Sequence, residues 1–332
     1  MKKQPLVTVV TITFNLKKSK REKYFRQCLK SVHGQTYKNI EHIIVDGASK
    51  DGTVVIIKQY VEKGWIKYIS EPDKGVYDAM NKGINLANGK YITFLNSDDF
   101  YHNNKAVELS VRALESSGAD YSFSDTRAVN AKDDSEIGTW KGNINLIPFG
   151  THYCHQSMFT RVDVLKEVGG FDMDHEVSAD SDLMIKLVAL NKKFAFVKDR
   201  IVSYRSGGLS NLHSQVNREE HSFAFYKYLG KDIGLTRKDC LDLWNFSVLT
   251  EKNFKYCLKL GLKLKKFGWA KEYYKRLFSF QNCKNHLKVS LPRPLARKLI
   301  FLSHLLRGEK DYYTRLFRWS MKKIGVGPQK RK

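Results

Sequence analysis

The sequence predicts an α/β fold, a mainly parallel β-sheet flanked by helices, followed by a helical segment. In the first hundred of its 332 residues, short β-branched runs alternate with segments of helical periodicity, which is typical of βαβ units. Polar residues stand where several of those runs end. After Gly207-Gly208 the strand pattern gives way to a stretch rich in Leu, Lys, Tyr and Phe. These three observations predict the fold class.

The individual elements follow from the spacing of apolar residues. Apolar or β-branched runs predict strands, and apolar residues three or four positions apart predict helices. In the first hundred residues we expect strands at 6–14, 40–45, 66–70 and 91–95, with helices at 22–33, 53–63 and 76–87 between them. After Asn103 the pattern is more mixed, and we expect helices at 105–116 and 181–190, strands at 121–124 and 194–197, and a loop at 131–138.

The ends of the predicted strands carry the residues that favour a binding site. Ligands of parallel sheets bind at the carboxyl ends of the strands. The polar residues at these ends are Thr13, Asn15, Asp46, Asn96, Asp98 and Asp99. Adjacent carboxylates after a buried strand suit Mg²⁺ or Mn²⁺, which prefer oxygen ligands and often bridge carboxylates to a diphosphate. Asp at a strand end is equally a common turn former, so the pattern alone leaves both interpretations open.

Positive charge is concentrated in the last third of the chain. The chain carries 58 Lys and Arg against 34 Asp and Glu, a net charge of +24, and residues 216–332 hold 28 and 9 of these. Charge segregated in this way indicates an anionic partner, either nucleic acid, an anionic membrane surface or an acidic substrate. Composition alone does not choose among the three.

Composition also excludes several classes of protein. With 6 Pro, 22 Gly and 28% charged residues, the chain is neither collagen-like nor wholly disordered. Its five cysteines include no Cys-x-x-Cys pair, so neither a zinc site nor a disulfide framework is indicated. No apolar run approaches the ~18 residues of a membrane-spanning helix. The apolar start of the chain is interpreted as a buried strand rather than an export signal. We expect a soluble or peripheral intracellular protein.

Three motifs carry a resemblance to a known family. They are VVTITFN, then IIVDGASKDGT, then EPDKGVYDAMNKGINLANGKYITFLNSDD. In this order and spacing they resemble the family 2 glycosyltransferases of the GT-A fold, over residues 6 to about 210. The version EPDKGVYDAMNKG is similar to the branch that builds bacterial surface polysaccharides such as O-antigen, capsule or exopolysaccharide. The resemblance implies an inverting, metal-dependent transfer of a sugar from a nucleotide-sugar to a hydroxyl group.

The resemblance gives provisional roles to residues on the donor side. Asp46 would accept a hydrogen bond from the nucleotide base, and Asp98 would bind the divalent cation, Mn²⁺ or Mg²⁺. The first Asp of the family's DxD motif is replaced by Asn96, whose amide still bonds a ribose hydroxyl but adds no charge toward a metal. The nucleotide-sugar site as a whole would comprise Thr13, Asn15, Asp46, Asp73, Asp78, Asn81, Lys82, Asn96 and Arg205. Arg205 would pair with phosphate oxygens, and His213 would add a further metal ligand.

The resemblance places the catalytic base at Asp180. This residue matches the Asp of a Glu-Asp pair in the family, with Ala179 in place of the Glu. A single carboxylate within hydrogen-bond reach of the acceptor hydroxyl is sufficient as general base, and no covalent intermediate is needed. His155 and Gln156 match a segment on the acceptor side. A plain helix cap at Asp180 and a core histidine at 155 are the structural alternatives.

The predicted organisation is a catalytic domain at 1–212, a basic helical domain at 213–326 and a disordered tail at 327–332. A UDP-sugar is the expected donor, with a GDP-sugar as the alternative, and a polyprenyl-diphosphate-linked glycan is the expected acceptor. The basic helices would hold the enzyme on the cytoplasmic face of the bacterial membrane. Two other hypotheses are a nucleic-acid-binding protein, which no motif supports, and an inactive glycosyltransferase-like assembly partner, which the Asn96 and Ala179 departures keep open.

Overall fold

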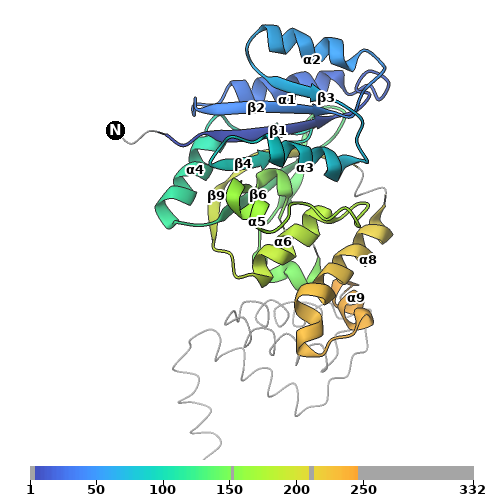
Figure 1. The fold of residues 1–332 in the computed structure, drawn as a ribbon. Coiled ribbons are helices and arrows are strands. Elements are labelled where there is room, and N and C mark those ends of the chain that lie inside the picture. Colours follow the sequence, from blue (N-terminus) through green and yellow to red (C-terminus); the bar gives the residue numbers. More distant parts are fainter. Residues whose placement is uncertain (1–3, 151–152, 209–212, 246–332) are drawn as a thin grey trace, which may run out of the picture. The chain divides into compact units, whose positions relative to one another are not determined.

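The computed structural model describes residues 4–150, 153–208 and 213–245 of the chain. A mixed, mostly parallel sheet forms its centre, with the strand order β3-β2-β1-β4-β8-β6-β9-β5 and with β7 paired to β6 (Figure 1). The strands are β1 (Val7–Thr13), β2 (Ile40–Asp46), β3 (Lys67–Ser70), β4 (Tyr91–Phe94), β5 (Phe100–Tyr101), β6 (Tyr121–Val129), β7 (Glu136–Trp140), β8 (Phe159–Arg161) and β9 (Phe194–Arg205).

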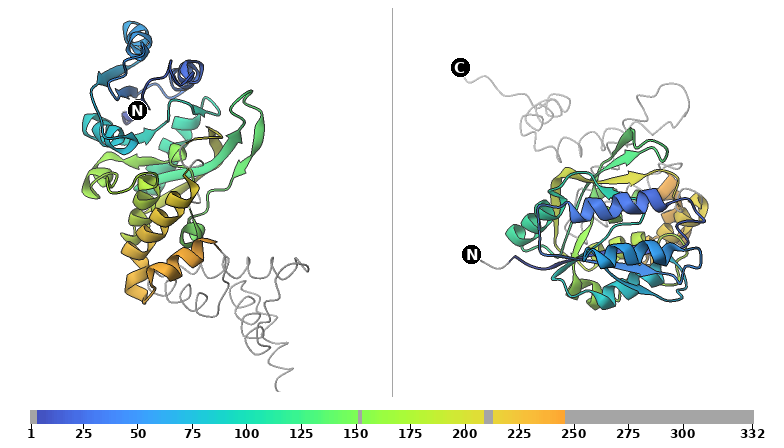
Figure 2. Two further views of the ribbon diagram at one scale, coloured as in Figure 1. Left: turned by 90° about the vertical axis from the view of Figure 1, so that its right-hand side faces the viewer. Right: turned by 90° about the horizontal axis from the view of Figure 1, so that it is seen from above.

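The helices lie between and after these strands. The α-helices are α1 (Glu22–His33), α2 (Thr53–Glu62), α3 (Val76–Leu86), α4 (Ala106–Ser117), α5 (Val162–Glu167), α6 (Ala179–Ala189), α8 (Ser214–Phe225) and α9 (Arg237–Asn245). Short helical turns are η1 (Ile144–Phe149), η2 (His155–Ser157), η3 (Tyr226–Gly230) and η4 (Lys231–Ile233). The two further views in Figure 2 show the helices on both faces of the sheet.

Strand β1 is covered on both faces, which explains its unbroken apolar sequence. Successive side chains of a strand point to opposite faces. Val9 packs in a buried cluster with residues of α1 and α4, such as Val32 and Val111. Val10 points the other way, where Gly83 of α3 contacts it. A strand buried on both faces reads as a continuous hydrophobic run rather than an alternating one.

The direction of the strands brings several chain segments to one edge of the sheet. β1 runs parallel to β2 and to β4. β8 runs antiparallel to both β4 and β6, and β6 is parallel to β9. The carboxyl ends of β1, β2, β4 and β9 therefore lie at the same edge, together with η2, which leads into β8. We call this the carboxyl edge.

The predicted α/β fold with a mainly parallel sheet is confirmed, and α1 has the predicted bounds. The loop expected at 131–138 is wrong at its end, because β7 begins at Glu136 and pairs with β6. The turn-forming residues before β7 favoured a loop, and β7 lacks the buried apolar positions from which a strand is predicted. The short elements β5, β8 and α5 were not predicted, because two to six residues carry too little periodicity to identify an element. Strands β6 and β9 extend further than expected.

The described chain continues past the predicted domain boundary into α8 and α9. Helix α8 packs against α6 and α9. The division at residue 212, the helical domain 213–326 and the tail 327–332 stay predictions, because residues 246–332 lie outside the described part. Among the described residues, no helix combines the length and the apolar character needed to span a bilayer.

The contact between α3 and β1 gives a test of the packing. A Cβ on Gly83 would lie 2.5 Å from Cγ1 of the buried Val10. We expect Gly83→Ala to lower the free energy of unfolding by up to about 2 kcal/mol, because overpacking costs about 1–3 kcal/mol and the gain in helix propensity offsets only ~1 kcal/mol of it. Urea unfolding measures the change. Gly138→Ala is the control, since a Cβ there meets nothing within 4 Å. Equal stability of the two variants would contradict the predicted contact.

Candidate active site

Asp46, at the end of β2, is buried and organises the donor side of the carboxyl edge. Its carboxylate accepts hydrogen bonds from Thr13 Oγ1 at 3.0 Å, from Ser70 Oγ at 2.7 Å, and from the backbone N and Oγ of Ser49 at 2.9 and 2.6 Å. A carboxylate has about four lone-pair sites, so these donors occupy all of them. In this conformation Asp46 fixes the ends of β1, β2 and β3, and its reading of a nucleotide base stays a prediction.

Asn15 shapes the loop after β1. Its φ of 47° lies in the left-handed region, which Asn tolerates better than most residues. Its backbone N donates to Ser49 Oγ at 2.8 Å, and its Oδ1 accepts from Lys50 N at 3.3 Å. The structure therefore brings the predicted residues Thr13, Asn15 and Asp46 together in one hydrogen-bonded corner.

The segment from Asp73 to Lys82 lies at the start of α3. Asp73 and Asp78 accept backbone hydrogen bonds within the turn, from Gly75 N and Lys74 N, both at 3.0 Å. Asp73 also lies against the donor-side corner, because a Cβ on Gly47 would meet its Oδ2 at 2.5 Å. Lys82 pairs with Glu71 at 2.9 Å. Asp73 therefore borders the corner formed by Asp46, and donor binding by Asp73, Asp78 and Lys82 stays a prediction.

Asn81 joins α3 to the chain that leads to Asp180. Its Nδ2 donates to the carbonyl of Phe171 at 2.9 Å, and its Oδ1 accepts from the Phe171 backbone N at 2.9 Å. Gly170 passes so close that a Cβ would lie 2.5 Å from Asn81 Oδ1, and its φ is +67°. Asn81 thus has a positioning contact, and its predicted contact with the donor stays a prediction.

The two acidic residues after β4 have different surroundings. Asp98 is partly exposed, and its Oδ2 lies 3.3 Å from Nη1 of Arg21. Asp99 is buried and accepts from Arg205 N and from Gln156 Nε2, both at 2.8 Å. Burial and the neighbouring Asp98 charge raise the pKa of Asp99 well above its usual range. Asp98 is therefore the carboxylate of this pair that remains open to a ligand.

Arg205 and Gln156 are engaged inside the protein. The guanidinium of Arg205 is buried, stacks over Tyr24 with 4.0 Å between the guanidinium carbon and the ring centroid, and bonds Asp134, the Asp98 carbonyl and Gln27. It would reach a diphosphate only by exchanging these partners, so that role stays a prediction. Gln156 is buried and bonds Asp99. Its side chain therefore supports Asp99 from inside the protein, and contact with an acceptor stays a prediction.

His155 and Asp180 form a pair on the other side of the carboxyl edge. Nδ1 of His155 lies 3.0 Å from Oδ2 of Asp180. The other carboxylate oxygen accepts from Ser181 N at 2.8 Å and lies 3.4 Å from the Tyr77 hydroxyl, whose proton is donated to the Val177 carbonyl at 2.7 Å. Burial alone would raise the pKa of Asp180, but the hydrogen bond and charge of His155 and the Ser181 donor lower it. Asp180 is thus held as a carboxylate.

Helix α8 holds the chain in front of Asp180, a contact the sequence gave no signal for. Glu220 accepts hydrogen bonds from the backbone N of Glu176, Val177 and Ser178 at 2.6, 3.0 and 2.8 Å. Ser178 also donates to Asn217 Oδ1 at 2.6 Å. Glu220 thus satisfies the backbone donors of the three residues that lead into α6, and its negative charge near the start of the helix suits the helix dipole.

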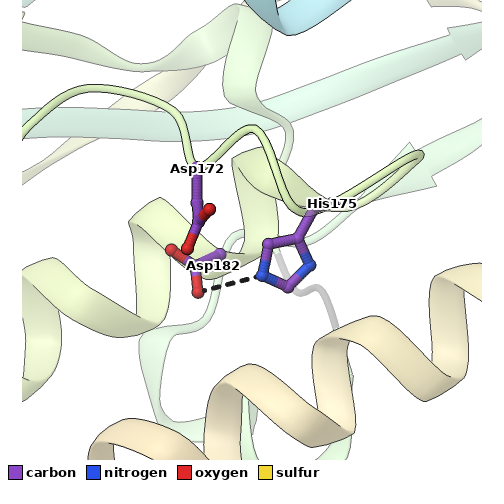
Figure 3. A group of neighbouring side chains, drawn as sticks. All are labelled: Asp172, His175 and Asp182. Atoms are coloured by element: carbon purple, nitrogen blue, oxygen red, sulfur yellow. Dashed lines mark ion pairs between the residues drawn. The ribbon is translucent and has the colours of Figure 1, made fainter.

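Asp182 of α6 comes together with Asp172 and His175 of the loop before that helix (Figure 3). Nε2 of His175 lies 3.3 Å from Asp182, and Nδ1 lies 3.8 Å from Glu220. Asp172 pairs with Lys227 of η3 at 3.0 Å. The three groups have the chemistry to ligate a cation, but His175 and Lys227 already offset the carboxylates. We interpret the cluster as an ion-pair network that joins α6, α8 and η3.

His213 is exposed at the start of α8. Within the described part of the chain, neither His213 nor Asp98 lies in a cluster of three His, Cys, Asp or Glu side chains that could bind a metal ion. A role for His213 as a metal ligand therefore stays a prediction.

Comparison with known proteins decides the family. The model of glycosyl transferase family 2 matches residues 8–169. An uncharacterized glycosyltransferase of Mycobacterium tuberculosis is 32% identical over 191 residues, which cover 56% of this chain and 70% of that protein. The PGL/p-HBAD biosynthesis glycosyltransferase of Mycobacterium bovis is 31% identical, over 55% of this chain and 73% of that protein. The chain belongs to glycosyl transferase family 2. The predicted family and the predicted enzyme class are confirmed.

Solved glycosyltransferase structures share the fold of this chain. The glycosyltransferase resembles S. aureus TarS 1-349 in complex with UDP-GlcNAc, with a TM-score of 0.56 and 17% identity over 81% of each chain. It also resembles the mannosyltransferase PcManGT from Pyrobaculum calidifontis in complex with GDP-Man and Mn²⁺, with a TM-score of 0.53 and 17% identity over 94% of this chain and 83% of that one. At this identity the likeness shows the fold alone, and the predicted GT-A fold is confirmed.

The His175 network predicts a pH dependence of stability. Burial alone would lower the pKa of His175, but Asp182, Glu220 and Asp172 raise it above its usual ~6.5. The imidazolium therefore stabilises the fold fully below that pH, and this stabilisation is lost as the pH rises through the folded-state pKa. We expect His175→Gln to lower the melting temperature by several degrees at pH 5.5 and by less at pH 9.

His221 provides a control of the opposite sign. Burial lowers its pKa to about 4, so the stability that it contributes is present above pH ~6.5 and declines as the pH falls. His221→Gln should therefore lose less stability in acid than at neutral pH. If both variants showed the same pH trend by thermal unfolding, the charge assignment of His175 would be wrong.

Proposed function

We propose that this enzyme transfers a sugar, with inversion, from a nucleotide-sugar donor to a hydroxyl group of a glycan acceptor. The observation that carries the proposal is the arrangement of the carboxyl edge. The donor-side corner of Thr13, Asn15 and Asp46 and the open Asp98 belong to this edge, and so does the His155–Asp180 pair. A transferase of this kind needs these two sets of groups on either side of one reacting carbon.

The donor side has features that suit a nucleoside diphosphate. The TarS structure contains UDP-GlcNAc and the PcManGT structure contains GDP-Man, which supports a nucleotide-sugar donor here. Asn96 Oδ1 is buried and has no hydrogen-bond partner among the described residues. A ribose hydroxyl would satisfy this oxygen. We propose a UDP-sugar as the donor, with a GDP-sugar as the alternative.

A divalent cation fits at Asp98. The carboxylate is 24% exposed and contacts only the more exposed Arg21 among the ion pairs of the described chain, so an incoming cation would replace one surface ion pair. Oxygen ligands of this kind suit Mn²⁺ or Mg²⁺. When bound, the cation would offset the charge that develops on the leaving diphosphate. The PcManGT structure, which contains Mn²⁺, supports this proposal.

The acceptor side supplies base catalysis. Asp180 is held ionised by His155 and Ser181, and Glu220 fixes the backbone in front of it. A base within reach removes the proton of the acceptor hydroxyl as its oxygen attacks the anomeric carbon. Attack from the face opposite the diphosphate inverts the configuration, and the diphosphate leaves with the electron pair of the broken C–O bond. The proton then passes to solvent.

The acceptor and the location of the enzyme follow from the charge of the chain. Residues 216–332 carry 28 Lys and Arg against 9 Asp and Glu. We propose that this segment meets an anionic membrane surface at the cytoplasmic face, where the enzyme would act on a polyprenyl-diphosphate-linked glycan of a surface-polysaccharide pathway. Each basic residue near anionic lipid adds ~1 kcal/mol of attraction. The relative of this chain named for PGL/p-HBAD biosynthesis is consistent with a glycan-building role.

Donor binding tests the proposed function directly. We expect one of UDP-GlcNAc, UDP-glucose and GDP-mannose, with Mn²⁺, to raise the melting temperature of the full chain. Ligand at ~100 times its Kd stabilises the folded state by ~2.7 kcal/mol. Asp98→Ala should abolish the part of the shift that depends on Mn²⁺, because the variant loses the proposed metal carboxylate.

Glu62→Ala is the matched control for this experiment. Glu62 is an exposed carboxylate at the end of α2, so its loss changes the net charge equally and should leave the shift intact. The absence of a shift with every nucleotide-sugar in the wild-type protein would refute the proposed donor class. A shift that survives in Asp98→Ala would refute the metal site.

A further inference from the structure

We infer that Trp140 and Tyr204 form an aromatic platform that binds a pyranose ring of the acceptor glycan. The inference rests on the proposed function and adds an acceptor-binding subsite to it. The two rings share one face of the sheet. Trp140 is exposed, and charged groups of the candidate active site lie near Tyr204.

The two rings project from the same face of the sheet. Trp140 at the end of β7 pairs with Thr126 of β6, and Tyr204 near the end of β9 pairs with Ala128 of β6. Paired residues of neighbouring strands point to the same face, and so do residues two apart along one strand. The indole and the phenol ring therefore meet across β6, with their centroids 4.9 Å apart and their planes inclined by 32°.

This face of the sheet is the one that carries the acceptor side. The thiol of Cys154 lies close to the Thr126 side chain, and Cys154 immediately precedes the turn η2 that carries His155, the partner of Asp180. Arg205, the next residue of β9 after the platform tyrosine, points to the other face, toward α1. The platform and the His155–Asp180 pair therefore lie on the same face.

Charges from both sides of the carboxyl edge act on the Tyr204 hydroxyl. Burial raises its pKa, and neighbouring groups that include Asp99, Asp98 and Asp180 raise it further. Coulombic interactions weaken with distance, so Tyr204 lies near the carboxylate proposed for the cation and near the one proposed for the acceptor. The platform is therefore placed beside the proposed point of sugar transfer.

Trp140 presents an aromatic surface to solvent. It is 46% exposed, whereas Trp is highly buried on average. The neighbouring position on the same face is open, because a Cβ on Gly138 would meet nothing within 4 Å. By contrast, Tyr153 is 2% exposed and stacks on Phe123, with 4.3 Å between the ring centroids. Trp140, unlike Tyr153, is open to a ligand.

A pyranose ring matches this surface chemically. Its faces present C–H groups polarised by the neighbouring oxygens, and the negative face of an aromatic ring attracts such groups while it covers their apolar area. Tyr204 orients the indole before a ligand arrives, which lowers the entropy cost of binding. Ligand sites combine aromatic side chains with a few polar groups, and the His155–Asp180 pair supplies such groups on this face. The hydroxyl groups of a stacked sugar lie on its rim, where one can face Asp180.

Saturation-transfer NMR with the full-length protein tests the platform. The probes are the methyl glycosides of glucose, galactose, mannose and N-acetylglucosamine, with and without UDP and Mn²⁺. We expect at least one of them to receive saturation at its C–H protons. Trp140→Ala should raise the dissociation constant of that glycoside by about tenfold, which corresponds to ~1.4 kcal/mol. Trp140→Phe keeps an aromatic ring and should have an intermediate affinity.

Ile137→Ala is the matched control. Ile137 lies on the same strand, is 57% exposed and has no aromatic ring, so its loss should leave the affinity for the glycoside unchanged. Equal affinity of wild type and Trp140→Ala, or the absence of glycoside binding by the wild-type protein, would overturn the inference. A loss in Ile137→Ala as large as that in Trp140→Ala would also overturn it.

Donor binding in the same variants separates this inference from the proposed function. We expect Trp140→Ala to keep the thermal shift that a nucleotide-sugar gives in the wild-type protein. Loss of that shift with unchanged glycoside affinity would place Trp140 on the donor side and overturn the inference. If no nucleotide-sugar shifts the wild-type protein, the proposed function fails, while the glycoside titration still measures binding at the platform.

Discussion

The site depends on one buried carboxylate, Asp99, that joins three segments distant in sequence. Asp99 follows β4, accepts from the backbone of Arg205 at the end of β9, and accepts from Gln156 in the turn before β8. An uncompensated buried carboxylate is costly, so its two hydrogen bonds and its raised pKa are the conditions for keeping it inside. Through Gln156 it places the adjacent His155, and through its chain neighbour it places Asp98. The donor and acceptor sides therefore share one anchor.

A second constraint comes from α8, which lies beyond the region matched by the family model. Glu220 of α8 accepts a hydrogen bond from the backbone two residues before Asp180. The ion pairs of His175 with Glu220 and of Lys227 with Asp172 join the loop before α6 to α8 and η3. The helix that carries Asp180 is thus oriented by groups from α8 and η3 as well as by the sheet. A side chain held by several independent contacts keeps its geometry. This is a physical reason for α8 to belong with the part of the chain that carries Asp180.

Much of the fold followed from the sequence, because β1 and β2 are rich in β-branched residues, α1 has helical periodicity, and all three lie where strands and helices alternate regularly. The corner at Asp46 was also predictable, since the carboxyl ends of parallel strands meet at one edge. Sequence reasoning missed Glu220 and Arg21, whose partners lie 42 to 77 positions away along the chain. Nothing in a local pattern identifies such partners, because surface charges of this kind are common. The short strands β5 and β8 were missed for lack of length.

The four acidic groups of the site show how surroundings assign chemistry to identical side chains. Asp46 is saturated with donors and serves as a structural hub, while Asp99 is buried beside another carboxylate and resists ionisation. Asp98 is partly exposed and open to a cation, and Asp180 is kept ionised by an imidazole. Titratable groups of one type whose surroundings shift their pKa values in different directions are typical of an active site. A carboxylate kept charged beside an imidazole suits the proton transfer that we propose for the acceptor side.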